Sequence, residues 1–257
     1  MAMPIDVGVA DLNLIAGDHV CAVYTGTAGR DAVLLPYLRA GLRGGDKVIA
    51  VVDSTSPSSV RAALDDGVDA QVSSRQLEVG TADDAYLPGG SFSTTATIGY
   101  WDELVGPAIR DDGYRFARVV GEMSWGMRGR RDEFLRYEAE LNRFAPRYPQ
   151  AILCLYDLAT FGGGILTDLL RTHPKLLMNG VYLDNPQYQD PDRYLDVPNP
   201  DAAVESALAG WREAVGILEK RELGTRARRR AERLVEHRFH RYQVARLDLD
   251  QAREGRG

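Results

Sequence analysis

Short apolar runs recur along the first two thirds of the chain and predict its strands. Each run is four to seven residues long and apolar nearly throughout, which is typical of strands covered on both faces of a parallel sheet. A later apolar stretch, Leu176–Leu183, predicts an edge strand or a hairpin. The predicted buried strands are His19–Tyr24, Lys47–Asp53, Leu77–Gly80, Phe116–Glu122 and Ala151–Asp157.

Helical patterns separate these runs. Apolar side chains recur at helical spacing over residues 33–42, and Gly44 with Gly45 ends that helix. Ser56 and Pro57 are the residue types of an N-cap and a first helical position. Because strands alternate with helices, the sequence predicts an α/β fold with a parallel sheet and helices on both faces. The other expected helices cover residues 94–112, 131–145 and 163–172.

A change of composition at residues 196–200 divides the chain into an α/β body, residues 1–198, and a helical extension, residues 199–257. We expect Asn199 to be the N-cap and Pro200 the first residue of the extension's helix. Two apolar stripes at helical spacing follow, and an Arg-rich run from residue 226 to 246 holds eight Arg and two Glu. The stripes comprise Leu208, Trp211, Val215 and Leu218, then Val235, Phe239, Tyr242 and Leu249.

The stripes of the extension need a partner surface, because leaving large apolar side chains in water is costly. They fit two short amphipathic helices or one kinked helix. We predict a homodimer through this helical extension, or contact with a signalling partner protein. A helix folded back on its own body is the alternative. Direct nucleic-acid contact is disfavoured, because only Phe239 and Tyr242 interleave with the Arg run.

The amino-acid composition excludes several classes of protein. The 257 residues are 44% hydrophobic and 26% charged, which is ordinary for a globular chain and excludes a disordered or collagen-like one. The net charge of −6 is uneven, with +3 on residues 199–257 and −9 on the rest, so the acidic body discourages nonspecific nucleic-acid binding. No run is apolar enough to span a membrane, and the first residues lack an export signal. We therefore expect a cytoplasmic location and two free thiols, Cys21 and Cys154.

The segment after the first predicted strand has the position of a phosphate-binding loop. It contains Gly26 and Gly29, but Arg30 and Asp31 stand where the nucleotide signature requires Lys and Ser or Thr. Without that Lys and hydroxyl we expect no ATP hydrolysis, although Arg30 can hold an anion. A tight strand-to-helix turn is the simpler interpretation of the two glycines.

Several side chains are expected at the carboxyl ends of the predicted strands, where open α/β sheets bind ligands. Glu122 ends one strand and is followed by Trp125, while Tyr24 and Tyr156 end two others. The sequence predicts one small-molecule pocket lined by these four residues, with aromatic walls and one carboxylate. A carboxylate that only caps the end of its strand is the alternative for Glu122.

His19 and Cys21 lie two residues apart on a predicted strand, so both point to one face. Two metal ligands are one interpretation, with Cys154 and His173 as further candidates, but the paired spacing of a structural zinc site is absent. A hydrogen-bonded histidine and a buried thiol form the simpler alternative. Ligand or redox sensing is a third interpretation.

Two X-Pro turns are expected to place further polar side chains at a pocket rim. One contains His173 before Pro174, and the other runs from Asn185 through Pro186 to Tyr188. Turn chemistry alone also explains these residue types.

Six motifs of the body follow one another along the chain: residues 18–24, 41–47, 121–125, 153–157, 171–174 and 185–188. Taken in this order, they resemble the MEDS domain, the methanogen/methylotroph DcmR sensory domain, over roughly residues 11–190. The resemblance implies a RecA/KaiC-like fold with a degenerate nucleotide loop, used as a sensor in signalling and transcription proteins. Small hydrocarbon-type ligands are proposed for that family, with the residues matching His19 and Cys21 as sensing candidates.

The sequence thus predicts a non-catalytic sensory protein that binds a small ligand, or senses redox state, and regulates a partner, with a role in transcriptional control. No kinase or helix-turn-helix output domain is recognisable, which favours an output through a partner. No cofactor is predicted. The alternatives are a nucleotide-binding protein or weak ATPase, and a sensor with metal or haem at His19 and Cys21.

Overall fold

A computed structural model describes residues 5–6, 13–64, 71–72 and 74–196, together with separate residues between 208 and 246. The chain forms two compact units, Met1–Leu195 and Asp196–Gly257. The predicted N-cap Asn199 and the following Pro200 lie outside the described residues. In the described part of the chain, no helix combines the length and the apolar character that crossing a membrane requires.

The first unit is built on a seven-stranded sheet with strand order β5-β4-β6-β7-β3-β8-β9. All neighbours pair in parallel except β8 and β9, which form an antiparallel hairpin at one edge. The sheet is therefore mixed but mostly parallel, and the predicted α/β class is confirmed. The strands are β3 (His19–Tyr24), β4 (Lys47–Val52), β5 (Leu77–Thr81), β6 (Ala117–Glu122), β7 (Gln150–Asp157), β8 (Lys175–Met178) and β9 (Val181–Asp184).

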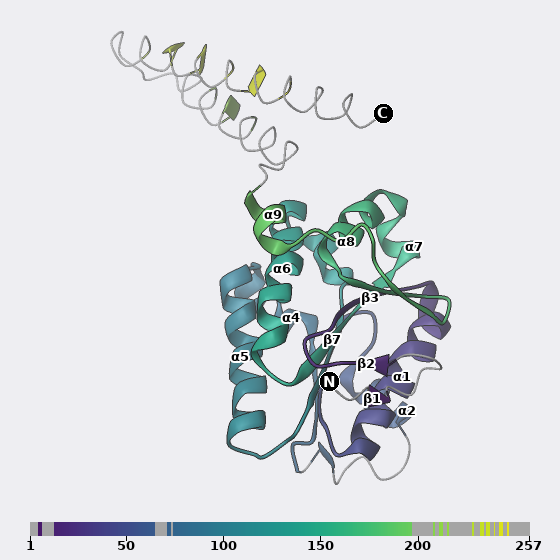
Figure 1. Ribbon diagram of the computed structural model, residues 1–257. Coiled ribbons are helices and arrows are strands. Elements are labelled where there is room, and N and C mark those ends of the chain that lie inside the picture. Colours follow the sequence, from purple (N-terminus) through teal and green to yellow (C-terminus); the bar gives the residue numbers. More distant parts are fainter. Residues whose placement is uncertain are drawn as a thin grey trace. The chain divides into compact units, whose positions relative to one another are not determined.

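Helices cover both faces of this sheet, giving three layers (Figure 1). Helices α1 and α2 pack on one face, and α4, α5, α6 and α8 pack on the other. A two-stranded pair, β1 (Ile5–Asp6) with β2 (Asn13–Leu14), precedes β3. The helices are α1 (Gly26–Gly44), α2 (Pro57–Ala63), α4 (Ala82–Ala85), α5 (Thr94–Arg110), α6 (Arg131–Phe144), α7 (Leu158–Phe161), α8 (Leu166–Thr172) and α9 (Pro191–Asp196).

Local sequence signals set two helix boundaries as predicted. Gly45 follows α1 with φ 74°, a left-handed conformation that ends a helix and that glycine adopts without a Cβ clash. The Ser56 side chain accepts a 3.0 Å hydrogen bond from the Ser59 amide at the start of α2, where Pro57 is the first helical residue. The short helices α4, α7 and α9 carry no apolar repeat and were not predicted.

Two apolar cores lie on opposite faces of the sheet. Successive strand residues alternate between faces, so Cys21 and Val23 of β3 belong to the core beneath α5 and α6, here called the α5–α6 face. Val20, Ala22 and Tyr24 belong to the core beneath α1 and α2, here called the α1–α2 face. This alternation decides which candidate residues can meet.

The second unit contains helical residues from both predicted apolar stripes. The Trp211 ring lies 5.1 Å from the Phe239 ring and 6.1 Å from the Tyr242 ring, measured between centroids. The two stripes therefore contact each other within this unit, which favours two helical segments over one helix. Leu218 and Leu249 lie outside the described residues.

Candidate functional site

Four side chains that can ligate a metal converge on the α5–α6 face. His19 begins β3, Cys154 lies in β7, Glu138 lies in α6, and His173 follows α8. One ligand-type atom from each lies within 4.8 Å of all the others. Each side chain is buried, with at most 2% of its surface exposed for any of the four residues. We call this group the histidine cluster.

Backbone pairing and helix packing bring the histidine cluster together. Strands β3 and β7 are neighbours in the sheet, with His19 opposite Ile152 and Cys21 opposite Cys154. Helix α6 packs against α8, which ends one residue before His173. Four segments that are distant in sequence therefore each place one ligand-type atom in the same buried cluster.

The interatomic distances within the cluster are short. The Nε2 atom of His19 lies 3.4 Å from Oε2 of Glu138 and 3.3 Å from Sγ of Cys154. The Nε2 atom of His173 lies 3.2 Å from the same Glu138 oxygen. The two imidazole rings are 4.2 Å apart between centroids. Both Nε2 atoms thus approach one carboxylate oxygen.

Asn142 fixes which nitrogen of His19 carries the hydrogen. Its amide nitrogen donates to the backbone oxygens of Glu138, Ala139 and Thr172, which can only accept. Its Oδ1 atom is therefore left to face Nδ1 of His19 at 3.1 Å. Nδ1 of His19 carries the hydrogen, and in the neutral ring Nε2 presents a lone pair to the cluster.

The second histidine is oriented in the same way. Nδ1 of His173 lies 2.8 Å from the backbone oxygen of Leu169, again an acceptor only, so it too carries a hydrogen. The Asn185 amide donates to the backbone oxygens of Leu170 and His173 at 2.5 and 2.6 Å and holds the turn after α8. Asn185 therefore positions His173 through the backbone and does not reach the cluster itself.

Glu138 is an ionised carboxylate in the protein interior. Burial opposes its charge, but hydrogen bonding and positive charge from His173 and His19 in their protonated forms outweigh that effect and hold its pKa at about 2. Burial, followed by the influence of His173, lowers the pKa of His19 and favours its neutral form. With both histidines neutral, neither Glu138 oxygen accepts a hydrogen bond from any residue in the described ranges. The negative charge thus lacks the hydrogen bonds that buried carboxylates normally receive.

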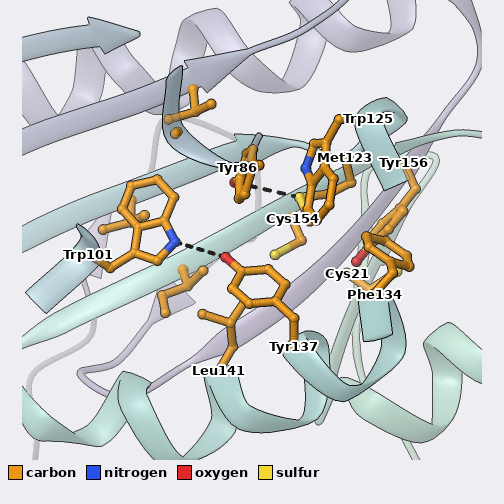
Figure 2. Close-up of a cluster of buried hydrophobic side chains, with 14 of the residues drawn as sticks. Cys21, Tyr86, Trp101, Met123, Trp125, Phe134, Tyr137, Leu141, Cys154 and Tyr156 are labelled. Atoms are coloured by element: carbon orange, nitrogen blue, oxygen red, sulfur yellow. Dashed lines mark hydrogen bonds between the residues drawn. The ribbon is translucent and has the colours of Figure 1, made fainter. Parts of the chain in front are cut away.

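Both cysteines are buried thiols. Burial, with a smaller contribution from Glu138, raises the pKa of Cys21 and of Cys154 well above the usual value. Buried thiols of this kind react slowly with oxidants, because the thiolate is the reactive form. Cys21 shares the apolar core of the α5–α6 face with Cys154 (Figure 2), but it does not belong to the four-residue histidine cluster.

A second polar group lies at the carboxyl ends of β3, β4 and β6. Glu122 is wholly buried and accepts hydrogen bonds from the amides of Asp53 and Ser54 at 2.7 and 2.9 Å. The Ser54 hydroxyl and the Tyr24 hydroxyl also donate to it. Both carboxylate oxygens are therefore occupied, so Glu122 ties three strand ends together.

Arg30 belongs to this second group. Its guanidinium donates to Asp31 at 2.9 Å and to the Ser54 hydroxyl at 2.8 Å, and it lies 3.8 Å from Glu122. Helix α1 starts at Gly26, two residues after β3 ends, and the Gly26 amide donates to Asp157. In a phosphate-binding loop this backbone amide would be free to bind the anion. Here the Gly26 amide already donates to the Asp157 carboxylate.

The predicted pocket of Tyr24, Glu122, Trp125 and Tyr156 needs correction. Tyr24 and Glu122 meet in the second polar group, but Trp125 and Tyr156 belong to the core of the α5–α6 face. Trp125 stacks on Tyr86 with centroids 4.4 Å apart (Figure 2), and Tyr156 lies edge-on to His173 at 5.5 Å. Residue alternation along the strands separates the two pairs.

The other site residues predicted from the sequence lie in the histidine cluster, in the adjoining apolar core and in the turn after Asn185. His19 and His173 form half of the histidine cluster, while Cys21 lies in the adjoining core. Tyr188 is half-buried in the turn after Asn185, and its amide donates to the Asn185 oxygen. Their roles toward a ligand stay predictions.

Sequence reasoning missed Glu138 and Asn142. One signal was available: Glu138 occupies a position in the apolar stripe of α6, four residues after Phe134 and three before Leu141. A charged residue on the buried face of an amphipathic helix needs a partner, so the helix pattern alone marks Glu138 as a candidate site residue.

The family model described as "MEthanogen/methylotroph, DcmR Sensory domain" (MEDS) matches residues 18–174, well over half of the chain. The chain belongs to the MEDS family. The match contains all four residues of the histidine cluster, the second polar group around Glu122 and the strands β3 to β7, whereas the parallel strand β8 begins at Lys175. The family resemblance expected from the sequence is confirmed.

Two further similarities extend this assignment. The chain is 29% identical over 174 residues to the transcriptional repressor DcmR of Methylorubrum extorquens, a match that covers 64% of this chain and 61% of that protein. The MEDS chain thus spans less than two thirds of this relative's length. The crystal structure of the flagellar accessory protein FlaH from Methanocaldococcus jannaschii matches with a TM-score of 0.50 and 11% identity, over 71% of this chain and 84% of FlaH. This likeness shows a RecA-like fold.

Proposed function

We propose that this MEDS protein is a non-catalytic sensor that binds a small ligand and controls transcription through a partner protein. The observation that carries the proposal is the sensory-family match over residues 18–174, which contains both buried polar groups. The similarity to a transcriptional repressor supports a regulatory output. A cytoplasmic location remains a prediction from the sequence.

The second polar group supports binding over catalysis. Glu122 is the residue that would have to orient water for nucleotide hydrolysis, but its two oxygens accept four hydrogen bonds from protein groups. The Gly26 amide is likewise bound to Asp157. These contacts favour a sensor over the alternative of a weak ATPase.

We place ligand contact at the carboxyl ends of the strands, next to Arg30. This edge is where open α/β sheets bind ligands, and it carries two arginines paired with carboxylates. Arg30 pairs with Asp31 at 2.8 Å, and the half-exposed Arg128 pairs with Asp53 at 2.5 Å. A ligand with an acidic or polar group can exchange with these carboxylates, which would couple binding to the position of α1.

Transcript sequencing tests the proposal. Deleting the gene is expected to change a defined set of transcripts, and the wild-type chain should restore them. Arg30→Gln should fail to restore them, whereas Arg136→Gln, an exposed arginine on α6, should succeed. Thermal melting of both purified variants checks that each is folded. Unchanged transcripts in the deletion strain, or full restoration by folded Arg30→Gln, would contradict the proposal.

A further inference from the structure

We propose that His19, Glu138, Cys154 and His173 bind one divalent transition-metal ion of the zinc class. Four ligand-type side chains, all buried, offer their donor atoms within 4.8 Å of one another. This site differs from the pair expected from the sequence, because Cys154 and Glu138 join His19 in place of Cys21. It is independent of the ligand site proposed next to Arg30.

Three of the distances between donor atoms match those of a tetrahedral metal site. Zinc lies about 2.0–2.3 Å from nitrogen, oxygen and sulfur ligands, so tetrahedral ligands are separated by roughly 3.2–3.7 Å. The Nε2 atoms of His19 and His173 lie 3.4 and 3.2 Å from Oε2 of Glu138. Sγ of Cys154 lies 3.3 Å from Nε2 of His19. Three edges of the tetrahedron are therefore present in the protein.

The orientation of the two imidazoles suits a bound cation. Each Nδ1 atom donates to an oxygen that can only accept, so each Nε2 lone pair is directed at the cluster. Both lone pairs approach the same oxygen of Glu138, which accepts no hydrogen bond from the described residues. The Cys154 sulfur lies 3.3 Å from Nε2 of His19 and the Tyr156 hydroxyl lies 3.4 Å from Nε2 of His173, so each can donate to its neighbour. Neither group brings positive charge to the Glu138 carboxylate, whereas a bound cation would meet both lone pairs and the carboxylate at once.

The surroundings resemble the outer shell of a metal site. Ligating histidines typically donate their other nitrogen to a carbonyl, carboxylate or water, which fixes the ring. Here the Asn142 side chain serves His19 and the Leu169 backbone serves His173. The outer partners come from α6 and α8, so these two helices orient histidines that begin β3 and follow α8.

The donor set and the charge select the metal. Two imidazoles, a thiol and a carboxylate suit zinc and similar borderline ions, whereas magnesium and calcium require mostly oxygen ligands. Binding releases the Cys154 proton to solvent and forms a metal–thiolate bond, since a coordinated thiol is deprotonated. The +2 ion is then balanced by one thiolate and one carboxylate, which leaves the buried site neutral.

Metal analysis of the full-length protein tests this inference. Protein purified without chelator, or reloaded with zinc after chelation, should contain about one zinc per chain, as expected for a closed four-ligand site. Cys154→Ala and His173→Ala should lose most of it. Cys21→Ala is the matched control and should retain it, because Cys21 lies opposite Cys154 in the sheet but outside the cluster.

Cobalt binding and thermal melting of the metal-free wild type test the inference even if a variant fails to fold. Cobalt added to the metal-free wild type should produce a thiolate-to-metal absorption band that Cys154→Ala lacks and Cys21→Ala keeps. Zinc, but not magnesium, should raise the melting temperature of the metal-free wild type. Failure of the wild type to bind zinc or cobalt, or full metal content in folded Cys154→Ala, would overturn the inference. So would loss of metal from folded Cys21→Ala. None of these results would affect the transcript test.

Discussion

Nε2 of His173 lies 3.2 Å from Oε2 of Glu138, and both side chains are completely buried. Glu138 belongs to α6, whereas His173 begins the two-residue segment that joins α8 to β8. The contact therefore links a helix to the neighbouring strand connection through a polar group inside an apolar core. Burying such a group is costly unless a partner compensates it. The stability of this region therefore depends on what compensates the Glu138 carboxylate.

Glu138→Gln is expected to destabilise the zinc-loaded protein by about 3–5 kcal/mol, as for loss of one partner from a buried charged pair. In chelator the difference from wild type should shrink, because the metal-free carboxylate has no hydrogen-bond donor in the described residues. Chemical denaturation with and without chelator measures both values.

The control for this change is Glu140→Gln, on the same helix. Glu140 pairs with Arg143 at the surface, so the loss should stay below about 1 kcal/mol in both buffers. An equal loss for Glu138→Gln with and without chelator would show that the carboxylate stabilises the histidines directly and not through a metal.

Asn142→Ala is expected to weaken metal binding by about 10–100-fold, the usual effect of removing an outer partner of a ligating histidine. The Asn142 oxygen holds Nδ1 of His19 at 3.1 Å, and without it the ring can turn away from the cluster. Competition titration with a chromophoric chelator measures the affinity, and the cobalt spectrum reports the geometry. An unchanged affinity and spectrum would place Asn142 in a purely structural role.

ATP turnover should stay at the buffer background with magnesium present. Arg30 and Asp31 replace the Lys and hydroxyl of the nucleotide loop, and the Glu122 oxygens are occupied by protein donors. A phosphate-release assay decides the point. Turnover that disappears in Glu122→Gln would contradict both this prediction and the sensor proposal.

Gly41→Ala is expected to cost about 1–3 kcal/mol of stability, in the range of overpacked cores. A Cβ atom at Gly41 would lie 2.6 Å from Cδ of Arg118 and 2.8 Å from Cγ2 of Val48. Arg118 has little freedom to move, because it is 2% exposed and its Nε donates to Asp46 at 2.7 Å. Urea unfolding measures the change.

Gly99→Ala is the matched helical control for Gly41→Ala. A Cβ atom there meets nothing within 4 Å of the described structure, so the higher helix propensity of Ala should stabilise α5 by about 0.5–1 kcal/mol. Equal effects of the two substitutions would show that the close contact between α1 and Arg118 does not restrict this position.

The apolar runs predicted most of the sheet because the signal for a buried strand is local. Residues 47–53 and 151–157, for example, are apolar nearly throughout, and each contains most of a buried strand. Local signals also predicted the end of α1 at Gly45 and the start of α2 at Pro57. The same patterns contain no information on strand order, which depends on contacts between distant segments.

The site was predicted only in part, for the same reason. The two-residue spacing of His19 and Cys21 indicated one face of a strand, but the partners of His19 come from α6, β7 and the end of α8. Tyr24 and Tyr156 both end strands, yet Tyr156 lies beside Val23 and therefore on the other face from Tyr24. Strand register, which the sequence alone does not determine, separates them.

Self-association through the C-terminal extension remains to be tested. Its described apolar residues Leu208, Trp211 and Val215 are only half-buried, although Trp211 contacts Phe239 and Tyr242 within the unit. Half-exposed apolar stripes gain free energy when a second copy covers them. We therefore expect full-length protein to be a dimer, and a protein ending at residue 198 to be a folded monomer. Light scattering and circular dichroism on both proteins measure this. A monomeric full-length protein would favour a helix folded back on its own body, and an unfolded truncated protein would show that the extension completes the core of the first unit.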